Sequence, residues 1–419
     1  MNAVIKPSHT QGKIKAIASK SAAHRLLICA AFARGETAVR CENINDDISA
    51  TVDCLCALGA EIKREGDFFK VTPAKKINKN ATLDCKESGS TLRFLIPVCA
   101  ALGADASFLM RGRLADRPLS PLQEELESRG VSFEKKDNML TVTGSLEEID
   151  ISIDGGVSSQ FISGLLMAIG VSGKNGRVRV TGVAASKPYI DLTADALATF
   201  GVSVTEKNGE YEISKNSGLI AAKEIAVEGD WSSAAFPLTM GVIGKGAITV
   251  TGLRPDSPQG DKNIVAVLKR MGARIEAEGD SVTAYPSELK GTEIDGENIP
   301  DLIPVLAVAA AVAQGKTVIY NAARLRIKES DRLAAISEML NTLGANVKET
   351  EDGLEIIGKS TLCGGKVSSF HDHRIAMSAA VASLRCKEEV IVTDACAVSK
   401  SYPTFFDDAQ ILGLDFEKC

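Results

Sequence analysis

Residues 264–273 read IVAVLKRMGA, an amphipathic stretch of helical periodicity that ends on a glycine. A glycine at this point is typical of a helix C-terminus, because it adopts the left-handed conformation that closes the last turn. The same ending recurs at Gly59, Gly130, Gly201, Gly272, Gly344 and Gly413. These glycines are spaced by 71, 71, 71, 72 and 69 residues. The chain therefore contains six copies of one unit.

Each unit also contains an earlier and more apolar helical stretch. These stretches begin at about Ser21, Ser90, Ser159, Ser232, Asp301 and His373. Most of them lead through a glycine into a β-branched strand, as in residues 246–250, which read GAITV. After the first five repeat glycines, two strand-like runs follow around a polar turn, for example 202–205 and 211–213. The sequence therefore predicts an α/β protein built from six β-α-β-α-β-β repeats.

The length of the repeat decides between two architectures. Solenoid repeats are usually ~20–45 residues long, so the spacing found here is too long for a solenoid. Six such repeats divide naturally into two globular domains of three repeats, each of ordinary domain size.

Composition excludes several classes of protein. The 419 residues are 45% hydrophobic and 24% charged, which is typical of a globular chain. The apolar runs 302–313 and 94–104 are shorter than the ~18 residues that a membrane span needs, and the first residues lack the apolar segment of a signal peptide. Ten sparse cysteines indicate reduced thiols, so we expect a cytoplasmic protein. The net charge of −6 argues against nucleic-acid binding.

The first helix of each repeat begins with small or polar residues. They are Lys20-Ser21, Ser88-Gly89-Ser90, Ser158-Ser159-Gln160, Ser232-Ser233, Pro300-Asp301 and Asp372-His373. Any one of these could simply be a helix cap. Because equivalent helices of one domain should point the same way, their N-termini would converge on one face that attracts phosphates and carboxylates.

Basic residues cluster at corresponding places in the repeats. They are Lys20, Arg25, Arg111, Arg113, Arg117, Arg324, Arg326, Lys328, Arg332, Arg374 and Lys400. A solvated charged face is the alternative interpretation. However, these residues alternate with Gly, Pro and Ser instead of forming helical i,i+4 pairs. Arginine also suits bidentate capture of phosphate or carboxylate, so we expect a small anionic ligand.

Two motif-like segments do not support a nucleotide or a metal. Residues 315–317 read GKT like the end of a P-loop, but Ala310 stands where the leading glycine should be, and the segment leaves a helix for a strand. His371-Asp372-His373 could form a metal corner, but no third ligand stands at a recognisable spacing. We therefore expect no metal.

Nine segments in order along the chain resemble the enolpyruvyl transferase family. They are residues 19–25, 88–93, 116–118, 158–161, 186–189, 259–261, 328–332, 372–374 and 400–403. The resemblance implies a fold of two inside-out α/β barrels with three repeats each. It also implies one domain formed by residues 1–18 and 229–419, another formed by 19–228, and an active site in the cleft between them.

The resemblance extends to the activity. The segments are most similar to those of the members that transfer the enolpyruvyl group of phosphoenolpyruvate to the 5-hydroxyl of shikimate 3-phosphate, on the pathway to chorismate and aromatic amino acids. The sister activity, with UDP-N-acetylglucosamine as acceptor, is an alternative, although the cysteine of that enzyme's loop is absent from residues 110–118. A non-catalytic repeat scaffold is a second alternative. The resemblance implies a monomer without a cofactor.

Site residues follow from the resemblance by position. Asp301 would accept the proton of the hydroxyl, and Glu329 and Lys20 would be its partners in proton transfer. The residues implied for shikimate 3-phosphate are Lys20, Ser21, Arg25, Ser158, Ser159, Gln160, Ser186, Tyr189, Asp301 and Lys328. Those implied for phosphoenolpyruvate are Lys20, Gly89, Arg117, Gln160, Arg332, Arg374 and Lys400. The residues alone leave two other readings open: a helix cap for Asp301 and an ion pair with a neighbouring arginine for Glu329.

Two positions depart from the family pattern. Glu87 stands where an Asn is common, two residues before Gly89, and Arg324 stands where some members have Asn. A carboxylate beside a bound anion is unfavourable unless it pairs with an arginine or points away.

Overall fold

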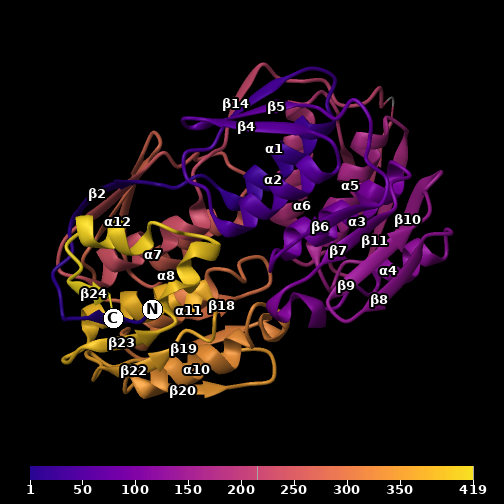
Figure 1. The fold of residues 1–419 in the computed structure, drawn as a ribbon. Helices are drawn as coiled ribbons and strands as arrows, with labels where there is room; N and C mark the ends of the chain where they lie inside the picture. The colour runs from indigo at the N-terminus through magenta and orange to yellow at the C-terminus, as the bar shows by residue number, and fades with distance from the viewer. Residues whose placement is uncertain (215, 419) are drawn as a thin grey trace. The chain divides into compact units, whose positions relative to one another are not determined.

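The computed structural model describes residues 1–214 and 216–418 and contains two compact units (Figure 1). Unit 1 comprises Met1–Ile17 and Glu228–Cys419, and unit 2 comprises Ala18–Val227. Each unit has its own core of buried apolar side chains, and among the described residues none belongs to both cores. The site is therefore described unit by unit.

The strands described here form six four-stranded sheets, three in each unit, and all six share one topology. The first two strands of each sheet run parallel, and the third and fourth are added antiparallel. In sheet order, the strands of unit 2 are β14 (Glu224–Ala226), β3 (Thr37–Arg40), β5 (Phe68–Thr72) and β4 (Glu61–Glu65); β6 (Ala81–Asp84), β7 (Ala106–Leu109), β9 (Met139–Thr143) and β8 (Ser132–Lys136); and β10 (Ile149–Asp154), β11 (Gly176–Thr181), β13 (Glu210–Ile213) and β12 (Thr205–Lys207). Those of unit 1 are β2 (Gly12–Lys15), β15 (Ile248–Thr251), β17 (Ser281–Tyr285) and β16 (Arg274–Glu278); β18 (Glu293–Asp295), β19 (Lys316–Tyr320), β21 (Leu354–Ile357) and β20 (Asn346–Glu349); and β22 (Gly365–Ser368), β23 (Val390–Thr393), β1 (Ala3–Ile5) and β24 (Phe416–Lys418).

Strands from distant parts of the chain complete three of the sheets. β2 lies parallel to β15, so the N-terminal segment supplies the first strand of the fourth sheet. β14 lies parallel to β3, so the last strand of unit 2 joins its first repeat. β1 pairs antiparallel with both β23 and β24, so the N-terminal strand supplies the third strand of the sixth sheet. The sixth repeat lacks the strand hairpin that ends the other five in sequence. An antiparallel pair of strands from the two ends of the chain, β1 and β24, takes its place.

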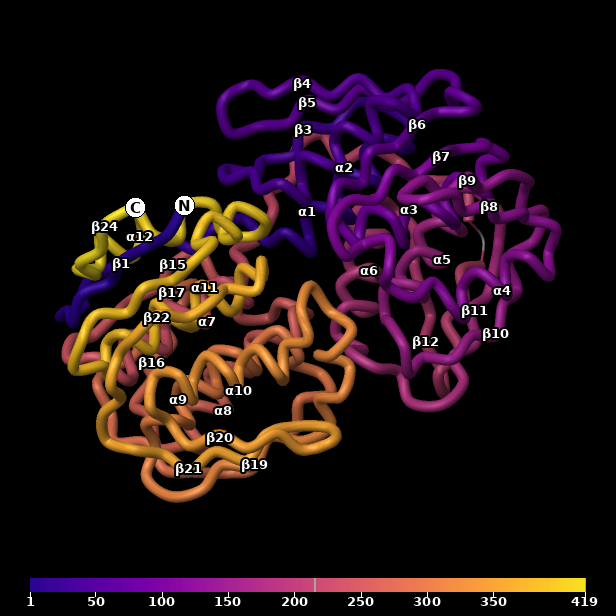
Figure 2. Tube along the Cα trace, turned by 60° about the horizontal axis from the view of Figure 1, so that its bottom comes forward, coloured from indigo at the N-terminus to yellow at the C-terminus, as the bar shows by residue number. Residues whose placement is uncertain are grey.

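The first helix of each repeat lies inside its unit. These helices are α1 (Lys20–Phe32), α3 (Gly89–Ala101), α5 (Ser159–Ser172), α7 (Trp231–Ile243), α9 (Ile303–Ala311) and α11 (His373–Ala382). Every residue of α7 and α9 is buried, as expected for α9, which is apolar all round, and for α7, whose only polar side chains are two serines and a threonine. In Figure 2 the strands of unit 2 lie toward its outside, with α1, α3 and α5 inside them. This arrangement, with helices inside and sheets outside, confirms the predicted fold class.

The second helix of each repeat ends as predicted. These helices are α2 (Asp46–Ala57), α4 (Leu122–Glu127), α6 (Lys187–Thr199), α8 (Ile264–Arg270), α10 (Arg332–Thr342) and α12 (Phe405–Ile411). All six repeat glycines that follow them have positive φ, between 80° and 113°. At Gly413 a Cβ atom would also approach His9 O to 2.6 Å, so a side chain is excluded there.

Short 3-10 helices complete the connections. They are η1 (Gly112–Asp116), η2 (Gly260–Asn263), η3 (Ala323–Ile327), η4 (Ser383–Arg385) and η5 (Ala395–Lys400). Across the described residues, every helix is too short or too polar to cross a membrane.

Candidate active site

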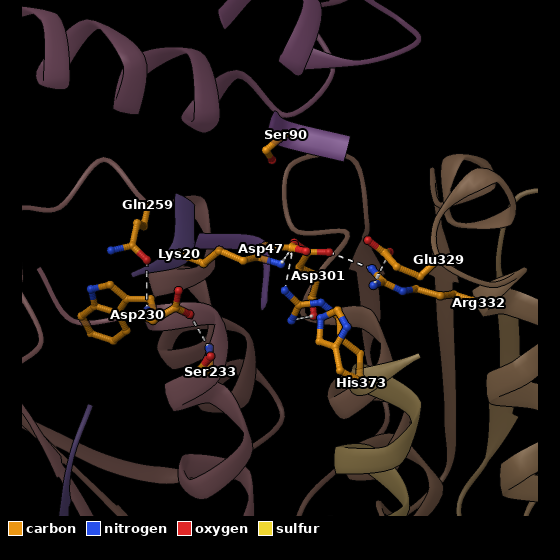
Figure 3. Close-up of polar contacts among 12 residues, drawn as sticks. Lys20, Asp47, Ser90, Asp230, Ser233, Gln259, Asp301, Glu329, Arg332 and His373 are labelled. Carbon is orange, nitrogen blue, oxygen red and sulfur yellow. Dashed lines mark hydrogen bonds and ion pairs between the residues drawn. The ribbon is translucent and has the colours of Figure 1, made fainter. Parts of the chain in front are cut away.

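Arg332, the first residue of α10, is the centre of an ion-pair cluster in unit 1 (Figure 3). Its Nη1 donates to Asp301 Oδ1 at 2.8 Å and its Nη2 donates to Glu329 Oε2 at 2.7 Å. Its Nε donates to Asp372 Oδ2 at 2.8 Å, and its Nη2 also donates to Asp372 Oδ1 at 3.4 Å. The ion pair that the sequence left open for Glu329 is therefore present. Because a guanidinium has five N–H groups, these four bonds leave one of them for a ligand.

Asp301 lies between two arginines. Arg374 Nη2 lies 3.0 Å from Asp301 Oδ2, and Arg374 Nη1 donates to the Asp301 backbone oxygen at 3.0 Å. Burial favours the neutral carboxyl, but Arg374, Arg332 and Lys328 outweigh burial, and the pKa of Asp301 is lowered. Asp301 is therefore a carboxylate at neutral pH. About a fifth of its side chain (21%) remains exposed, so a ligand can reach it.

The helix-cap interpretation of Asp301 is wrong. The first helical residue of α9 is Ile303, and Leu302 occupies the N-cap position without a side-chain hydrogen bond. Pro304 lies in the first turn, where the missing N–H of proline is tolerated. The predicted start at Asp301 was two residues too early because Pro300-Asp301 looks like a capping pair.

Asp372 holds both arginines of this cluster in place. Its side chain is fully buried and caps α11 by accepting a bond from the Arg374 backbone N–H at 2.9 Å. It also accepts from Ser330 Oγ at 3.0 Å, in addition to Arg332. The carboxylate therefore fixes the side chain of Arg332 and the backbone of Arg374 at the same time.

The two histidines of segment 371–373, which was considered above as a metal corner, lie in different environments. His371 is 82% exposed, with its Nδ1 3.5 Å from Asp394 Oδ2, whereas His373 is buried. Among the described residues, no three His, Cys, Asp or Glu side chains gather as metal ligands would.

Asp261, in η2, is a second buried carboxyl near Asp301. Burial and repulsion by Asp301 raise its pKa to about 7, and the positive charge of Arg374 acts in the opposite direction. Its neighbour Gln259 has a structural task, because its Oε1 accepts from Trp231 N at 3.0 Å and its Nε2 donates to Gly229 O at 2.9 Å (Figure 3). Asp261 is thus a group that can hold or release a proton near neutral pH.

The other basic candidates of unit 1 lie on neighbouring segments. Lys328 follows η3, and Lys400 is the last residue of η5 and is buried. Arg324, the departure from the family pattern, donates through Nη2 to Glu297 O at 2.6 Å, so part of its guanidinium is bound to the protein's own backbone.

In unit 2, the ammonium of Lys20 meets the carboxylate of Asp47. Lys20 is the first residue of α1 and Asp47 lies in the first turn of α2. Lys20 Nζ donates to Asp47 Oδ2 at 2.9 Å, and both side chains are mostly buried (Figure 3). The Asp47 carboxylate therefore holds a mostly buried cation at the N-terminus of α1, where the helix dipole alone would disfavour it.

Gly89 makes room for Arg117. Gly89 is the first residue of α3, where the N-cap Ser88 accepts a bond from Thr91 N at 3.3 Å. A Cβ atom at Gly89 would lie 2.8 Å from Arg117 Nη1. The guanidinium therefore lies directly against the helix N-terminus, which is a suitable arrangement for an anion.

Glu87 is directed at Gly112. A Cβ atom at Gly112, where φ is +52°, would lie 2.5 Å from Glu87 Oε1. The carboxylate that departs from the family pattern thus occupies the space left by a missing side chain at the start of η1.

Gln160 connects α5 to α3. Its Oε1 accepts from Arg93 Nη1 at 2.8 Å, and its Nε2 donates to Ser90 Oγ at 3.0 Å. Ser158 caps α5 by accepting from Gln160 N at 3.3 Å, and the following residue, Ser159, is buried.

Arg25 is engaged by its own unit. Its side chain is buried and donates to Ser21 O at 2.6 Å and Tyr189 O at 2.9 Å. Burial lowers its pKa to about 10, so it stays charged at neutral pH. Ser186, just before α6, has a left-handed backbone with φ of +57°. The structure thus brings Ser21, Arg25 and Tyr189 together.

Sequence reasoning missed Asp47, Asp372, Arg93 and Asp261 as members of the site. Arg93, Asp372 and Asp261 lay within the recognised segments, but only the tertiary structure shows what they contact. Asp47 lies outside those segments and acts across two helices, so its position in sequence gave no signal.

The fold is that of the enolpyruvyl transferases. The enolpyruvyl transferase NikO from Streptomyces tendae superposes with a TM-score of 0.79 at 18% identity, covering 99% of this chain and 98% of that one. An EPSP synthase structure from Acinetobacter baumannii superposes with a TM-score of 0.82 at 26% identity, covering 99% of both chains.

Sequence comparison defines the family further. The family model described as EPSP synthase (3-phosphoshikimate 1-carboxyvinyltransferase) matches residues 4–409. A Clostridium perfringens 3-phosphoshikimate 1-carboxyvinyltransferase is 43% identical over 415 residues, covering 98% of both chains. A Clostridioides difficile protein of the same name is 40% identical over 423 residues, covering 98% of this chain and 97% of that one. The chain therefore belongs to the EPSP synthase family.

Proposed function

We propose that this chain transfers the enolpyruvyl group of phosphoenolpyruvate to the 5-hydroxyl of shikimate 3-phosphate and releases phosphate. This is a step of the shikimate pathway toward chorismate and aromatic amino acids. The observation that carries the proposal is the 43% identity to a named 3-phosphoshikimate 1-carboxyvinyltransferase along 98% of both chains. The family match does not favour the UDP-N-acetylglucosamine activity or a non-catalytic scaffold.

The reaction is an addition followed by an elimination. In the addition, the hydroxyl loses a proton, its oxygen bonds to the central carbon of phosphoenolpyruvate, and the methylene carbon gains a proton. In the elimination, the resulting methyl group loses a proton and the bond to phosphate breaks. Electrons are not transferred to or from an acceptor, so acid–base groups and anion-binding groups are sufficient for the chemistry.

Asp301 is the proposed acceptor of the hydroxyl proton. Its lowered pKa keeps it ionised, which a proton acceptor requires, but also makes it a weak base. The arginines that lower this pKa, Arg332 and Arg374, are also proposed ligands of phosphoenolpyruvate. A bound anion would compete for their charge, so we expect substrate binding to raise the pKa of Asp301 and strengthen it as a base.

Lys20 and Glu329 are the proposed partners for proton transfer at the methylene carbon. Lys20 can donate a proton from an ammonium that Asp47 holds at 2.9 Å, and Glu329 can accept one beside Arg332. An acid and a base are both needed, because the methyl carbon gains a proton in one half-reaction and loses one in the other.

The proposed substrate contacts are the residues that the resemblance implied. For phosphoenolpyruvate they are Lys20, Gly89, Arg117, Gln160, Arg332, Arg374 and Lys400. For shikimate 3-phosphate they are Lys20, Ser21, Arg25, Ser158, Ser159, Gln160, Ser186, Tyr189, Asp301 and Lys328. The cluster around Arg332 balances Arg332, Arg374 and Lys328 against Asp301, Glu329 and Asp372. Binding of a substrate anion to this cluster is therefore favoured once one of its carboxylates is displaced or protonated.

Phosphate release tests the proposal directly. The protein is mixed with phosphoenolpyruvate and shikimate 3-phosphate, and free phosphate is measured over time. The same assay is repeated with UDP-N-acetylglucosamine as acceptor. We expect release only with shikimate 3-phosphate; release only with the second acceptor would overturn the substrate assignment, and release with neither would overturn the activity. The proposal also includes a monomer in the cytoplasm, and sedimentation tests the monomer.

A further inference from the structure

Unit 2 contains a buried polar chain that the proposed mechanism does not use. It consists of His24 on α1, Thr51 on α2, Thr91 on α3 and Ser88, the N-cap of α3. His24 Nδ1 lies 2.6 Å from Thr51 Oγ1, and Thr51 Oγ1 lies 2.7 Å from Thr91 Oγ1. Thr91 Oγ1 donates to Ser88 Oγ at 2.7 Å. All four residues are fully buried, so water does not compete for these bonds.

The direction of the hydrogen bonds fixes the state of His24. Each threonine hydroxyl has one proton, and that of Thr91 goes to Ser88. The proton of Thr51 must then go to Thr91, so Thr51 can only accept from the ring of His24. Burial lowers the pKa of His24 to about 3, which keeps the ring neutral at physiological pH. His24 is therefore the neutral tautomer with its proton on Nδ1.

The buried polar chain lies one helical turn below the Lys20–Asp47 pair. His24 follows Lys20 by four residues on α1, and Thr51 follows Asp47 by four residues on α2. Residues four apart lie on one face of a helix, so the two contacts lie one turn apart between α1 and α2. The outer contact is charged and partly exposed, with an N–O distance of 2.9 Å, and the inner contact is neutral and buried.

The buried polar chain ends at the N-terminus of α3, the helix whose first residue is Gly89. Ser88 accepts from both the hydroxyl and the backbone N–H of Thr91, which orders the first turn of α3. The three helix N-termini that carry Lys20, Asp47 and Gly89 are thus connected by one continuous set of buried hydrogen bonds.

We propose that His24 is a positioning residue, which keeps the N-terminal turns of α1, α2 and α3 in register for the reaction. It does so through Thr51 and Thr91 and touches no substrate. This inference rests on the proposed function. Breaking the buried polar chain should weaken the contribution of Lys20 to turnover and that of Gly89 to phosphoenolpyruvate binding. Shikimate 3-phosphate contacts on α5 and α6 should be less affected.

The test interrupts the buried polar chain at Thr51, its central residue. Thr51→Val keeps the shape of the side chain but removes both hydrogen bonds, and Thr51→Ser keeps the hydroxyl. We expect kcat/KM for phosphoenolpyruvate to fall at least roughly tenfold in Thr51→Val, as small misplacements of catalytic groups do, and to recover in Thr51→Ser. Calorimetric affinity for shikimate 3-phosphate should fall by less than kcat/KM does. Of its proposed ligands, only Lys20, Ser21 and Arg25 lie on α1, whereas five others lie on or next to α5 and α6.

The matched control is Thr239→Val in unit 1. Thr239 is also fully buried, but its hydroxyl donates only within α7, to Ala235 O at 2.8 Å. It should also lower the Tm, although by less because it removes one hydrogen bond instead of two, while leaving kcat/KM unchanged. Wild-type kinetics in a folded Thr51→Val protein whose Tm is lowered at least as much as that of the control would overturn the inference.

A second pair of variants decides the matter if Thr51→Val does not fold. His24→Leu removes the donor, and His24→Asn returns an amide N–H near the position of Nδ1. Impaired kcat/KM in His24→Leu with recovery in His24→Asn supports the inference, and equal kinetics in the two overturn it. Failure of the wild-type protein to release phosphate from phosphoenolpyruvate and shikimate 3-phosphate would instead overturn the proposed function, and the inference with it.

Discussion

Arg332 and Asp372 form an ion pair in which neither side chain reaches solvent: the Nε–Oδ2 distance is 2.8 Å, and the exposed fractions are 1% and 0%. Burial lowers the pKa of Arg332, but Asp372, Glu329 and Asp301 outweigh burial and raise the pKa above its usual value. The guanidinium is thus permanently charged, as an anion-binding group must be, and the carboxylates make its burial possible.

Removing the charge of Asp372 should destabilise unit 1. Asp372→Asn keeps a good N-cap residue for α11 but leaves Arg332 with one carboxylate fewer. We expect the free energy of unfolding to fall by roughly 3 kcal/mol, the lower end for breaking a buried pair, because Asp301 and Glu329 remain. Urea unfolding measures this.

The control for that variant is Asp407→Asn. Asp407 is 64% exposed and lies 3.7 Å from Lys418, so it should change stability by less than about 0.5 kcal/mol. Equal stability of Asp372→Asn and the control would contradict the structural role of Asp372.

Lys20→Met should abolish turnover in a folded protein. The substitution removes the ammonium proposed for proton transfer, and general acid–base groups contribute about 10²–10⁴-fold to rates. Steady-state phosphate release measures kcat, and circular dichroism checks the fold. Lys63→Met is the control, since Lys63 is 69% exposed on β4 of the same unit and pairs only with Glu61 among the described residues. Near wild-type turnover in folded Lys20→Met would refute the catalytic assignment.

The repeat could be predicted from the sequence because the end of a helix commonly requires a residue in the left-handed conformation, and glycine adopts it most easily. Gly59 and Gly272 meet this requirement with φ of +113° and +99°, whatever the helix packs against. The stretch at 264–273 became α8 and its glycine ending in the same way.

Only part of the candidate site could be predicted from the sequence. Arg332, Glu329 and Asp301 could be named because they lie in recognised motifs. The Lys20–Asp47 pair could not, because its two members are 27 residues apart on different helices, and only packing brings them to 2.9 Å. The start of α9 was misplaced for a related reason: Asp301 faces Arg332 and Arg374 instead of capping the helix, and those partners are 31 and 73 residues away.

Gly89→Ala should weaken phosphoenolpyruvate binding through Arg117. The new Cβ would lie 2.8 Å from Arg117 Nη1, so the guanidinium must move. We expect KM for phosphoenolpyruvate to rise roughly tenfold, which corresponds to about 1.4 kcal/mol, with a smaller change in kcat. Initial rates at saturating shikimate 3-phosphate measure both constants.

A double-mutant cycle isolates the contact between Gly89 and Arg117. In an Arg117→Ala background there is no guanidinium to displace, so adding Gly89→Ala should have little further effect on KM. Additive effects of the two substitutions would show that Gly89 acts in some other way.

The stability of the protein should depend on pH through His24. Burial, together with the nearby charges of Lys20 and Arg25, lowers its pKa to about 3, although Asp47 acts in the opposite direction. In the unfolded chain the ring has a pKa of about 6.5 and takes up a proton below that pH. Between these two values the unfolded state binds more protons than the folded state, so stability falls as the pH falls, by about 1.4 kcal/mol per pH unit from this group. Urea unfolding at several pH values between about 6.5 and 4.5 measures the slope. Other groups also titrate in this range. Asp261, whose pKa is raised to about 7, makes stability rise as the pH falls. The informative quantity is therefore the difference between wild type and His24→Asn, which lacks the titrating ring. We expect the wild-type protein to lose stability more steeply than His24→Asn over this range, and parallel slopes would show that His24 does not remain neutral in the folded state.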